Sequence, residues 1–150
     1  VLFAVDRFAS YKEDWGAFYE QGGVVIANRY TTSNAVHQAS KLPVGERREF
    51  LNWLFDLEYR RLGLPAPDLV VSLDLPTELS EQMLRRRETA TGTQADIHEQ
   101  DEEYLRSCRM NAREIARDLA WTVIHCDRDG SVRTVEDIHS EVWAQVRRFL

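Results

Sequence analysis

Hydrophobic and polar positions along the chain follow two patterns, one typical of amphipathic helices and one typical of buried strands. Over residues 2–21, aromatic residues recur mostly every three or four positions, which predicts a helix that ends at Gly22 and Gly23. Further helices are predicted over residues 33–40, 44–62, 77–87 and 135–150, and through Leu105, Met110, Ile115 and Leu119.

Three short apolar runs, residues 24–27, 69–74 and 121–126, predict strands. The run at residues 24–27 is wholly apolar, which is typical of parallel strands that are covered by helices on both faces. Because helices and strands alternate, the sequence predicts an α/β fold with a three-layer arrangement, a parallel sheet flanked by helices. Asp129 and Gly130 predict a turn after the last strand.

Length and composition favour one globular domain over residues 1–150. The chain has 150 residues, of which 43% are hydrophobic, enough for one core. The net charge of -6 and the pI near 5.2 argue against a general grip on a nucleic acid polymer. Cys108 and Cys126 show no metal-ligand spacing, and no apolar run is long enough to span a membrane. We therefore expect a cytoplasmic protein with reduced thiols.

Polar residues follow each predicted strand, where α/β sheets bind ligands. Asp74 ends the second strand and Asp127 follows the third, while Asn28 and Arg29 follow the first. The planar fork of Arg29 suits a phosphate group. In the alternative interpretation, Arg29 only pairs with a nearby carboxylate, and Thr32 or Ser33 is an ordinary helix N-cap.

Five blocks of sequence, in order, resemble the thymidylate kinases, nucleoside monophosphate kinases that phosphorylate dTMP. The resemblance covers all 150 residues. The blocks are Phe-Ala-Val-Asp-Arg at 3–7, Asn-Arg-Tyr-x-x-Ser-Asn-x-x-His-Gln at 28–38, residues 67–74, residues 85–99 and Cys-Asp at 126–127. The resemblance implies transfer of the γ-phosphoryl group of ATP to dTMP, with Mg²⁺ accompanying ATP.

The resemblance also implies a dTMP site. By the family pattern, Phe3 would stack on thymine, Arg7 would bond the base or the acceptor phosphate, and Asn34 would read the polar edge of thymine. Arg29 would hold the acceptor phosphate and, with Asn28, make up the catalytic pair. For Phe3 alone, core packing is the competing interpretation. The implied dTMP-binding residues are Phe3, Arg7, Arg29, Ser33, Asn34, His37 and Gln38.

On the ATP side, the resemblance implies a mobile lid over residues 88–98 and contacts from Arg85, Arg87, Glu99 and Asp127. Residues 89–94 are polar, which favours a loop, and residues 88–97 contain no Lys or Arg to deliver to the transferred phosphoryl group. In the competing interpretation, the arginines lie at a solvated helix end and complement its dipole. Glu99 is then an ordinary exposed carboxylate at the start of a helix. No metal ligand is assigned in this chain.

Two features depart from the family pattern. The 150 residues contain no Gly-x-x-x-x-Gly-Lys-Ser/Thr loop, so we expect a P-loop kinase-like fold that lacks its P-loop strand here, with an amino-terminal unit of at least about 30 residues outside this sequence. Asn28 replaces the usual aspartate. The chain alone is then expected to be inactive. Two alternatives stay open, a nucleotide-binding pseudokinase and a deoxynucleoside kinase.

The aromatic face of the first predicted helix bears on assembly. It carries Phe8, Tyr11, Trp15 and Phe18, more apolar surface than one core needs. The family resemblance implies a homodimer packed through helices. Burial of the same face within one chain is the alternative.

Overall fold

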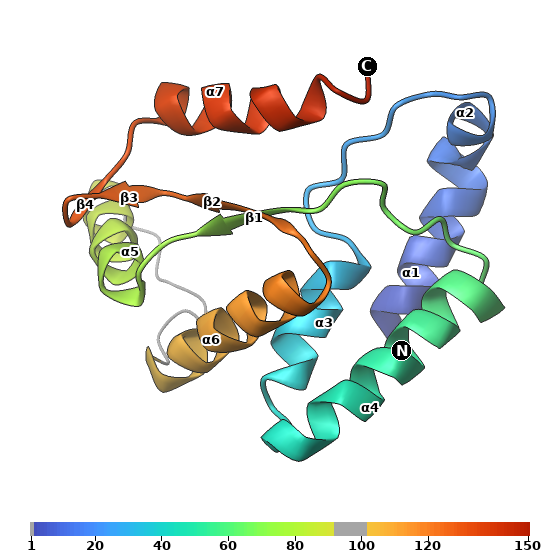
Figure 1. The fold of residues 1–150 in the computed structure, drawn as a ribbon, viewed down its shortest axis with the longest axis horizontal. Helices are drawn as coiled ribbons and strands as arrows, with labels where there is room; N and C mark the ends of the chain where they lie inside the picture. Colours follow the sequence, from blue (N-terminus) through green and yellow to red (C-terminus); the bar gives the residue numbers. More distant parts are fainter. Residues whose placement is uncertain (1, 92–101) are drawn as a thin grey trace. The chain divides into compact units, whose positions relative to one another are not determined.

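A computed structural model describes residues 2–91 and 102–150 of the chain. The chain divides into two compact units, Val1–Asp68 and Leu69–Leu150, and each unit is considered by itself. As Figure 1 shows, the fold is α/β, mostly helical with a small parallel sheet. None of the helices within the described ranges is both long and apolar enough to cross a membrane.

The first unit opens with one long helical segment, as predicted. It ends in a Schellman motif, in which Gly22 has φ 89° and Gly23 donates its N–H to the Phe18 carbonyl at 3.0 Å. The middle of the segment is π-helical, which periodicity did not predict. In order, the segment comprises α1 (Leu2–Ser10), η1 (Tyr11–Trp15) and α2 (Gly16–Glu20).

Two more helices complete the first unit and confirm the prediction. Helix α3 spans Thr31–Ala39, and Pro43 precedes α4, Val44–Phe55. Helix α4 continues into a π-helical turn, η2, over Asp56–Arg61. The segment ends at Gly63, whose φ of 67° favours glycine.

The strand predicted over residues 24–27 is wrong. These residues form no strand, and Val24, Val25 and Ile26 are 47%, 37% and 79% exposed. An apolar run becomes a strand only where a neighbouring strand takes up its backbone hydrogen bonds. No strand pairs with this run within the described residues.

The second unit contains the parallel sheet. Strand β1 (Val71–Asp74) pairs with β2 (Thr122–His125), and Asp74 lies opposite His125 at the carboxyl ends. The strands predicted over residues 69–74 and 121–126 are thus confirmed, and each is shorter than predicted. Of the three strands predicted in this chain, these two form the parallel sheet within the described residues.

Helices pack against this sheet. Helix α6 (Glu102–Asp118) contacts β1, and α7 (Val135–Val146) contacts β2. The core includes Ile115 of α6 and Ile124 of β2, at 3% and 1% exposure. Helix α7 ends at Val146 rather than at 150 as predicted.

Helix α5 is longer than expected. It spans Thr77–Thr91, so the loop predicted from residue 88 or 89 is wrong for its first residues. The Thr89 hydroxyl donates to the Arg85 carbonyl at 2.9 Å, which satisfies a polar side chain within the helix. The remainder of the expected lid, and Glu99, lie outside the described residues.

A short hairpin follows β2. Strands β3 (Asp127–Arg128) and β4 (Ser131–Val132) pair antiparallel, and the turn between them confirms the prediction at Asp129 and Gly130. Both turn residues have positive φ, 51° and 74°, as a two-residue type I′ turn requires. The two strands themselves were too short to predict.

Candidate functional site

In the first unit, a buried carboxylate joins the side chains of three helical segments. Glu58 of η2 is fully buried and accepts hydrogen bonds from Arg7 Nε at 2.7 Å and Arg7 Nη2 at 2.9 Å. It also accepts from the Thr31 hydroxyl at 2.7 Å and from Asn34 Nδ2 at 3.4 Å. We call these four residues the Glu58 cluster. The structure thus brings together two residues, Arg7 and Asn34, that the sequence analysis placed in one site.

The Glu58 cluster is charged. Burial by itself raises the pKa of Glu58, but the hydrogen bonds from Arg7, Thr31 and Asn34 outweigh it, so the pKa lies below its usual range. Glu58 is therefore ionised and forms a bidentate pair with Arg7, the geometry that guanidinium and carboxylate groups favour.

Tyr30 supports the guanidinium of Arg7 from one face. The Arg7 Cζ atom lies 5.7 Å from the centre of the Tyr30 ring, within cation–π range. The Tyr30 hydroxyl donates to the Pro65 carbonyl at 3.0 Å, and burial raises the pKa of this phenol well above its usual value. The Tyr30 ring is thus held at its far end as well.

Arg29 lies on the exposed segment before α3. Its Nε donates to Ser33 Oγ at 3.2 Å, and no carboxylate within the described residues forms an ion pair with it. Its φ of 71° is unusual for a residue with a side chain. Tyr30 occupies the N-cap position of α3 without a side-chain cap bond, so the alternative in which Thr32 or Ser33 is the N-cap is wrong.

The other predicted dTMP-site residues are spread over α1 and α3. Phe3 is 65% exposed, so the alternative of core packing for Phe3 is wrong, and Phe3 lies one turn before Arg7 on α1. Asn28 is exposed. His37 and Gln38 are half-buried in the last turn of α3, where the His37 carbonyl accepts from the Ser40 hydroxyl at 2.9 Å.

In the second unit, Asp74 is a second buried carboxylate, at the carboxyl end of β1. It accepts from Arg109 at 2.8 and 3.2 Å and from Arg113 at 2.9 and 3.2 Å. His125 Nδ1 lies 3.3 Å from the same carboxylate. Burial raises the pKa of Asp74, but the two arginines outweigh burial and hold it below its usual range.

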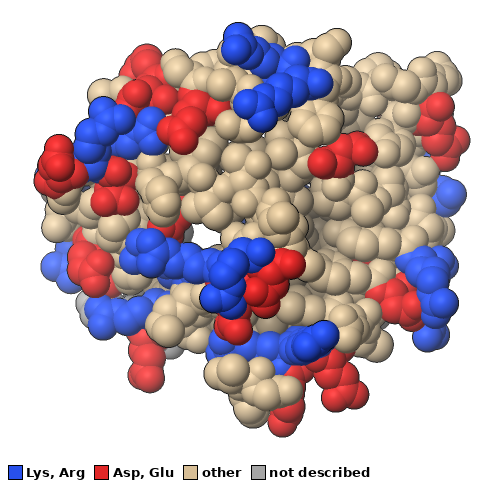
Figure 2. All heavy atoms as spheres, viewed as in Figure 1, with Lys and Arg blue, Asp and Glu red and all other residues tan. Residues whose placement is uncertain are grey.

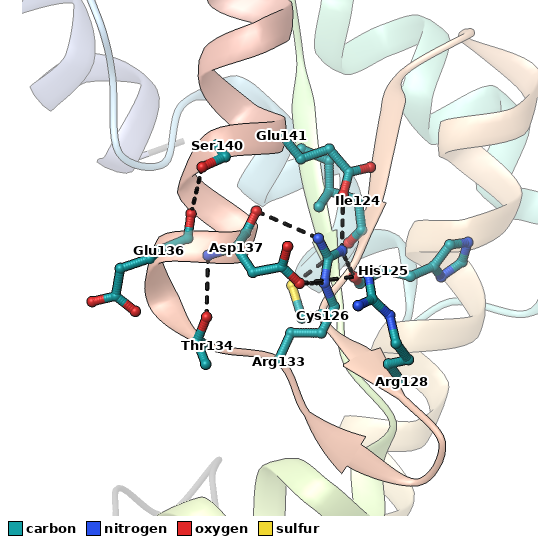
Figure 3. Close-up of polar contacts among 10 residues, drawn as sticks. All are labelled: Ile124, His125, Cys126, Arg128, Arg133, Thr134, Glu136, Asp137, Ser140 and Glu141. Atoms are coloured by element: carbon teal, nitrogen blue, oxygen red, sulfur yellow. Dashed lines mark hydrogen bonds and ion pairs between the residues drawn. The ribbon is translucent and has the colours of Figure 1, made fainter.

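The loop that was predicted to face ATP is joined to α7 by Arg133 and by Arg128, whose Nη2 lies 3.5 Å from Asp137 (Figure 3). Arg133 Nε donates to Asp137 at 2.8 Å, and its Nη1 donates to Glu141 at 2.8 Å and to the His125 carbonyl. The hydrogen bonds from Arg133 hold the pKa of Asp137 below its usual range. Asp127, one of the predicted ATP-side residues, is half-buried in β3, at the start of this loop.

The remaining predicted ATP-side residues in the described ranges are Arg85 and Arg87, both exposed on α5. Figure 2 shows that basic side chains mostly lie beside acidic ones on the visible face. Within residues 2–91 and 102–150, no three His, Cys, Asp or Glu residues form a group that could hold a metal ion. Cys108 and Cys126 are both buried cysteines.

Sequence reasoning missed Glu58, Thr31, the arginines of α6 and Arg133. A signal for Glu58 was present, because it falls four positions after Leu54 and seven after Leu51, on the apolar stripe of its helix. A charged residue at such a position is rarely buried without a partner. No comparable signal marks Arg133, which lies in a short loop.

The fold and these contacts define an α/β protein with charged groups at the carboxyl edge of a small parallel sheet. Comparison with known proteins narrows this class. The sequence model of the family described as thymidylate kinase matches residues 1–141. The chain belongs to the thymidylate kinase family.

Individual relatives agree with this family. A thymidylate kinase from Mycobacterium tuberculosis (strain CDC 1551 / Oshkosh) is 32% identical over 132 residues, 85% of this chain and 61% of the relative. A "Probable thymidylate kinase" from Pyrococcus horikoshii is 30% identical over 150 residues, 100% of this chain and 64% of the relative. The chain therefore spans less than two thirds of the length of these relatives.

Proposed function

We propose that the whole protein is a thymidylate kinase that transfers the γ-phosphoryl group of ATP to the phosphate of dTMP. The observation that carries the proposal is the Glu58 cluster, which holds Arg7 and Asn34 together, in a chain of this family that also exposes Phe3 and Arg29. Catalysis consists of positioning and charge neutralisation, without a covalent intermediate.

Each acceptor-side residue has a chemical role in this proposal. The guanidinium of Arg29 neutralises the dTMP phosphate, and its hydrogen bond to Ser33 limits its rotation. The ring of Phe3 stacks on thymine, since it is exposed and lies one helical turn from Arg7. Asn34 reads the polar edge of the base. His37 lies near the deoxyribose and Gln38 toward the base.

On the donor side, Arg85, Arg87 and Asp127 face ATP, together with Glu99 of the lid. Mg²⁺ commonly binds through one or two carboxylates plus substrate phosphates, so a protein cage of three carboxylates is not needed. Mg²⁺ bound to ATP would supply positive charge that neutralises the phosphates. We also propose a P-loop kinase-like sheet, a cytoplasmic location and a homodimer for the whole protein, as the family resemblance implies.

The test is the steady-state kinetics of Arg29→Ala in the full-length protein. The variant is expected to raise the KM for dTMP by about 100-fold, because a charge-assisted contact to phosphate is lost, while the KM for ATP stays within about two-fold. Arg60→Ala is the matched control, since Arg60 is exposed and pairs only with Asp56 in the described structure. An unchanged KM for dTMP in Arg29→Ala would remove Arg29 from the site.

Asn28 favours a second candidate function, a pseudokinase that binds dTMP without turnover. The position is exposed and carries a neutral amide, which attracts Mg²⁺ or its bound water less than a carboxylate does. Calorimetric binding of dTMP without ADP formation from Mg²⁺–ATP would favour this candidate. Tighter binding of thymidine than of dTMP would instead favour a deoxynucleoside kinase.

A further inference from the structure

Glu58 uses both of its oxygens to hold side chains that belong to the proposed dTMP site. Oε2 accepts from Arg7 Nε and from the Thr31 hydroxyl, while Oε1 accepts from Arg7 Nη2 and Asn34 Nδ2. These donors come from α1 and α3, and Glu58 itself comes from η2. One carboxylate thus fixes the relative placement of two predicted nucleotide-binding residues from different helices.

The bidentate contact orients the guanidinium of Arg7. Two parallel hydrogen bonds to one carboxylate fix the plane of a guanidinium, and the Tyr30 ring lies against it at 5.7 Å. The Nη1 group is the part of Arg7 that Glu58 does not engage. Because these contacts hold the guanidinium plane, they also fix the orientation of its remaining N–H donors.

The same carboxylate orients the amide of Asn34. An ionised carboxylate only accepts hydrogen bonds, so the Nδ2 group of Asn34 must face Glu58. The Oδ1 atom of Asn34 is then turned away from Glu58 as an acceptor. An N–H donor on the edge of a pyrimidine base fits that acceptor.

We infer that Glu58 is a positioning residue for the nucleoside monophosphate, one that sets the orientation of Arg7 and Asn34 without touching the nucleotide. The inference rests on the proposed function. It is distinct from a purely structural role, in which the ion pair would only join helices. A positioning role affects the handling of dTMP specifically, whereas a structural role lowers the fraction of folded protein and so affects both substrates alike.

The experiment compares wild-type full-length protein with Glu58→Gln, which keeps the shape of the side chain and removes its charge. We expect the KM for dTMP to rise by about 10- to 100-fold, the range expected for small misplacement of binding groups, with the KM for ATP within about two-fold. Glu58→Asp keeps the charge on a shorter side chain, and its KM for dTMP is expected to lie between those of Glu58→Gln and wild type. Glu49→Gln, at an exposed position on α4, is the matched control and is expected to leave both constants unchanged.

Folding is measured in parallel by near-ultraviolet circular dichroism and urea unfolding. If Glu58→Gln does not fold, Thr31→Val takes its place, because it removes one hydrogen bond from Glu58 and leaves the ion pair. Thr31→Val is expected to raise the KM for dTMP by about three- to ten-fold. A folded variant with an unchanged KM for dTMP, or with equal effects on both substrates, overturns the role of Glu58 while the proposed function stands. Wild-type protein that neither binds nor phosphorylates dTMP overturns both.

Discussion

At the scale of single residues, two buried carboxylates, Glu58 and Asp74, are each ion-paired with arginine. Glu58 and Asp74 are both nearly inaccessible to water, and arginines hold the pKa of each below its usual range. A buried charge of this kind is stable only while its partners remain in place. The stability of each unit therefore depends on pH through these groups.

We expect Asp74→Asn to lower the free energy of unfolding at pH 7 by about 1–3 kcal/mol, since it removes the carboxylate that accepts hydrogen bonds from Arg109 and Arg113. The folded-state pKa of Asp74 lies below its ordinary value of 3.8, so the unfolded chain binds more protons in the interval between the two values. The contribution of Asp74 is thus complete above the ordinary pKa and is lost as the pH falls through the folded-state pKa. Urea unfolding of both proteins between pH 7 and pH 3 should show the difference shrinking at acidic pH.

Asp118→Asn is the control for this experiment. Asp118 pairs with Arg117, and both side chains are mostly exposed, so the substitution should change stability by less than about 0.5 kcal/mol at every pH. If the difference in free energy of unfolding between wild type and Asp74→Asn stayed constant from pH 7 to pH 3, protonation of Asp74 would not account for the pH dependence.

At the scale of elements, the π-helical turn in the first segment has a local cause that can be tested. Gly16 donates to the Tyr11 carbonyl five residues earlier, and a methyl group at Gly16 would lie 2.4 Å from that oxygen. Gly16→Ala should therefore destabilise the protein by about 1–3 kcal/mol, although alanine favours helices. Thermal and urea unfolding measure the effect.

Gly45 in α4 gives the matched comparison. A methyl group there meets no atom within 4 Å, so Gly45→Ala should raise the free energy of unfolding by about 0.5–1 kcal/mol. If both alanine variants changed stability in the same direction, crowding at Gly16 would not be the cause.

Most helices could be predicted from the sequence because residues at their ends specify where they begin and end. Pro43 and Gly63 bracket the segment of α4 and η2, and Gly22 ends the first segment. The run at residues 24–27 shows where local patterns fail. An apolar run forms a strand only where a second strand pairs with its backbone. The π-turn at Gly16 depends on an i to i−5 contact, which neither propensity nor periodicity indicates.

The candidate site was predictable in part. Arg7 and Asn34 were expected to share a site from the family resemblance, and the structure brings them together through Glu58. Glu58 itself was missed because a glutamate on a helix is usually exposed, and only its tertiary partners make burial possible. The roles of Phe3, Arg29, His37 and Gln38 stay predictions.

At the largest scale, we expect the two compact units of the given chain to unfold together, because single domains of about this length typically unfold as one cooperative unit. Trp15 and Trp53 report on the first unit once Trp121 and Trp143 are replaced by Phe. The buried thiols of Cys108 and Cys126 report on the second unit through labelling. Fluorescence and labelling should give one urea midpoint, and two separate midpoints would mean two independent domains.

The π-helical turn that carries Glu58 also has an evolutionary consequence. Each hydrogen bond of such a turn encloses one residue more than an α-helical bond does. A relative whose helix remains α-helical through this stretch places its side chains one position out of phase with Asp56–Arg61. An alignment with such a relative would need a single-residue gap here to match the carboxylate, and insertion or deletion of one codon would add or remove the π-helical turn.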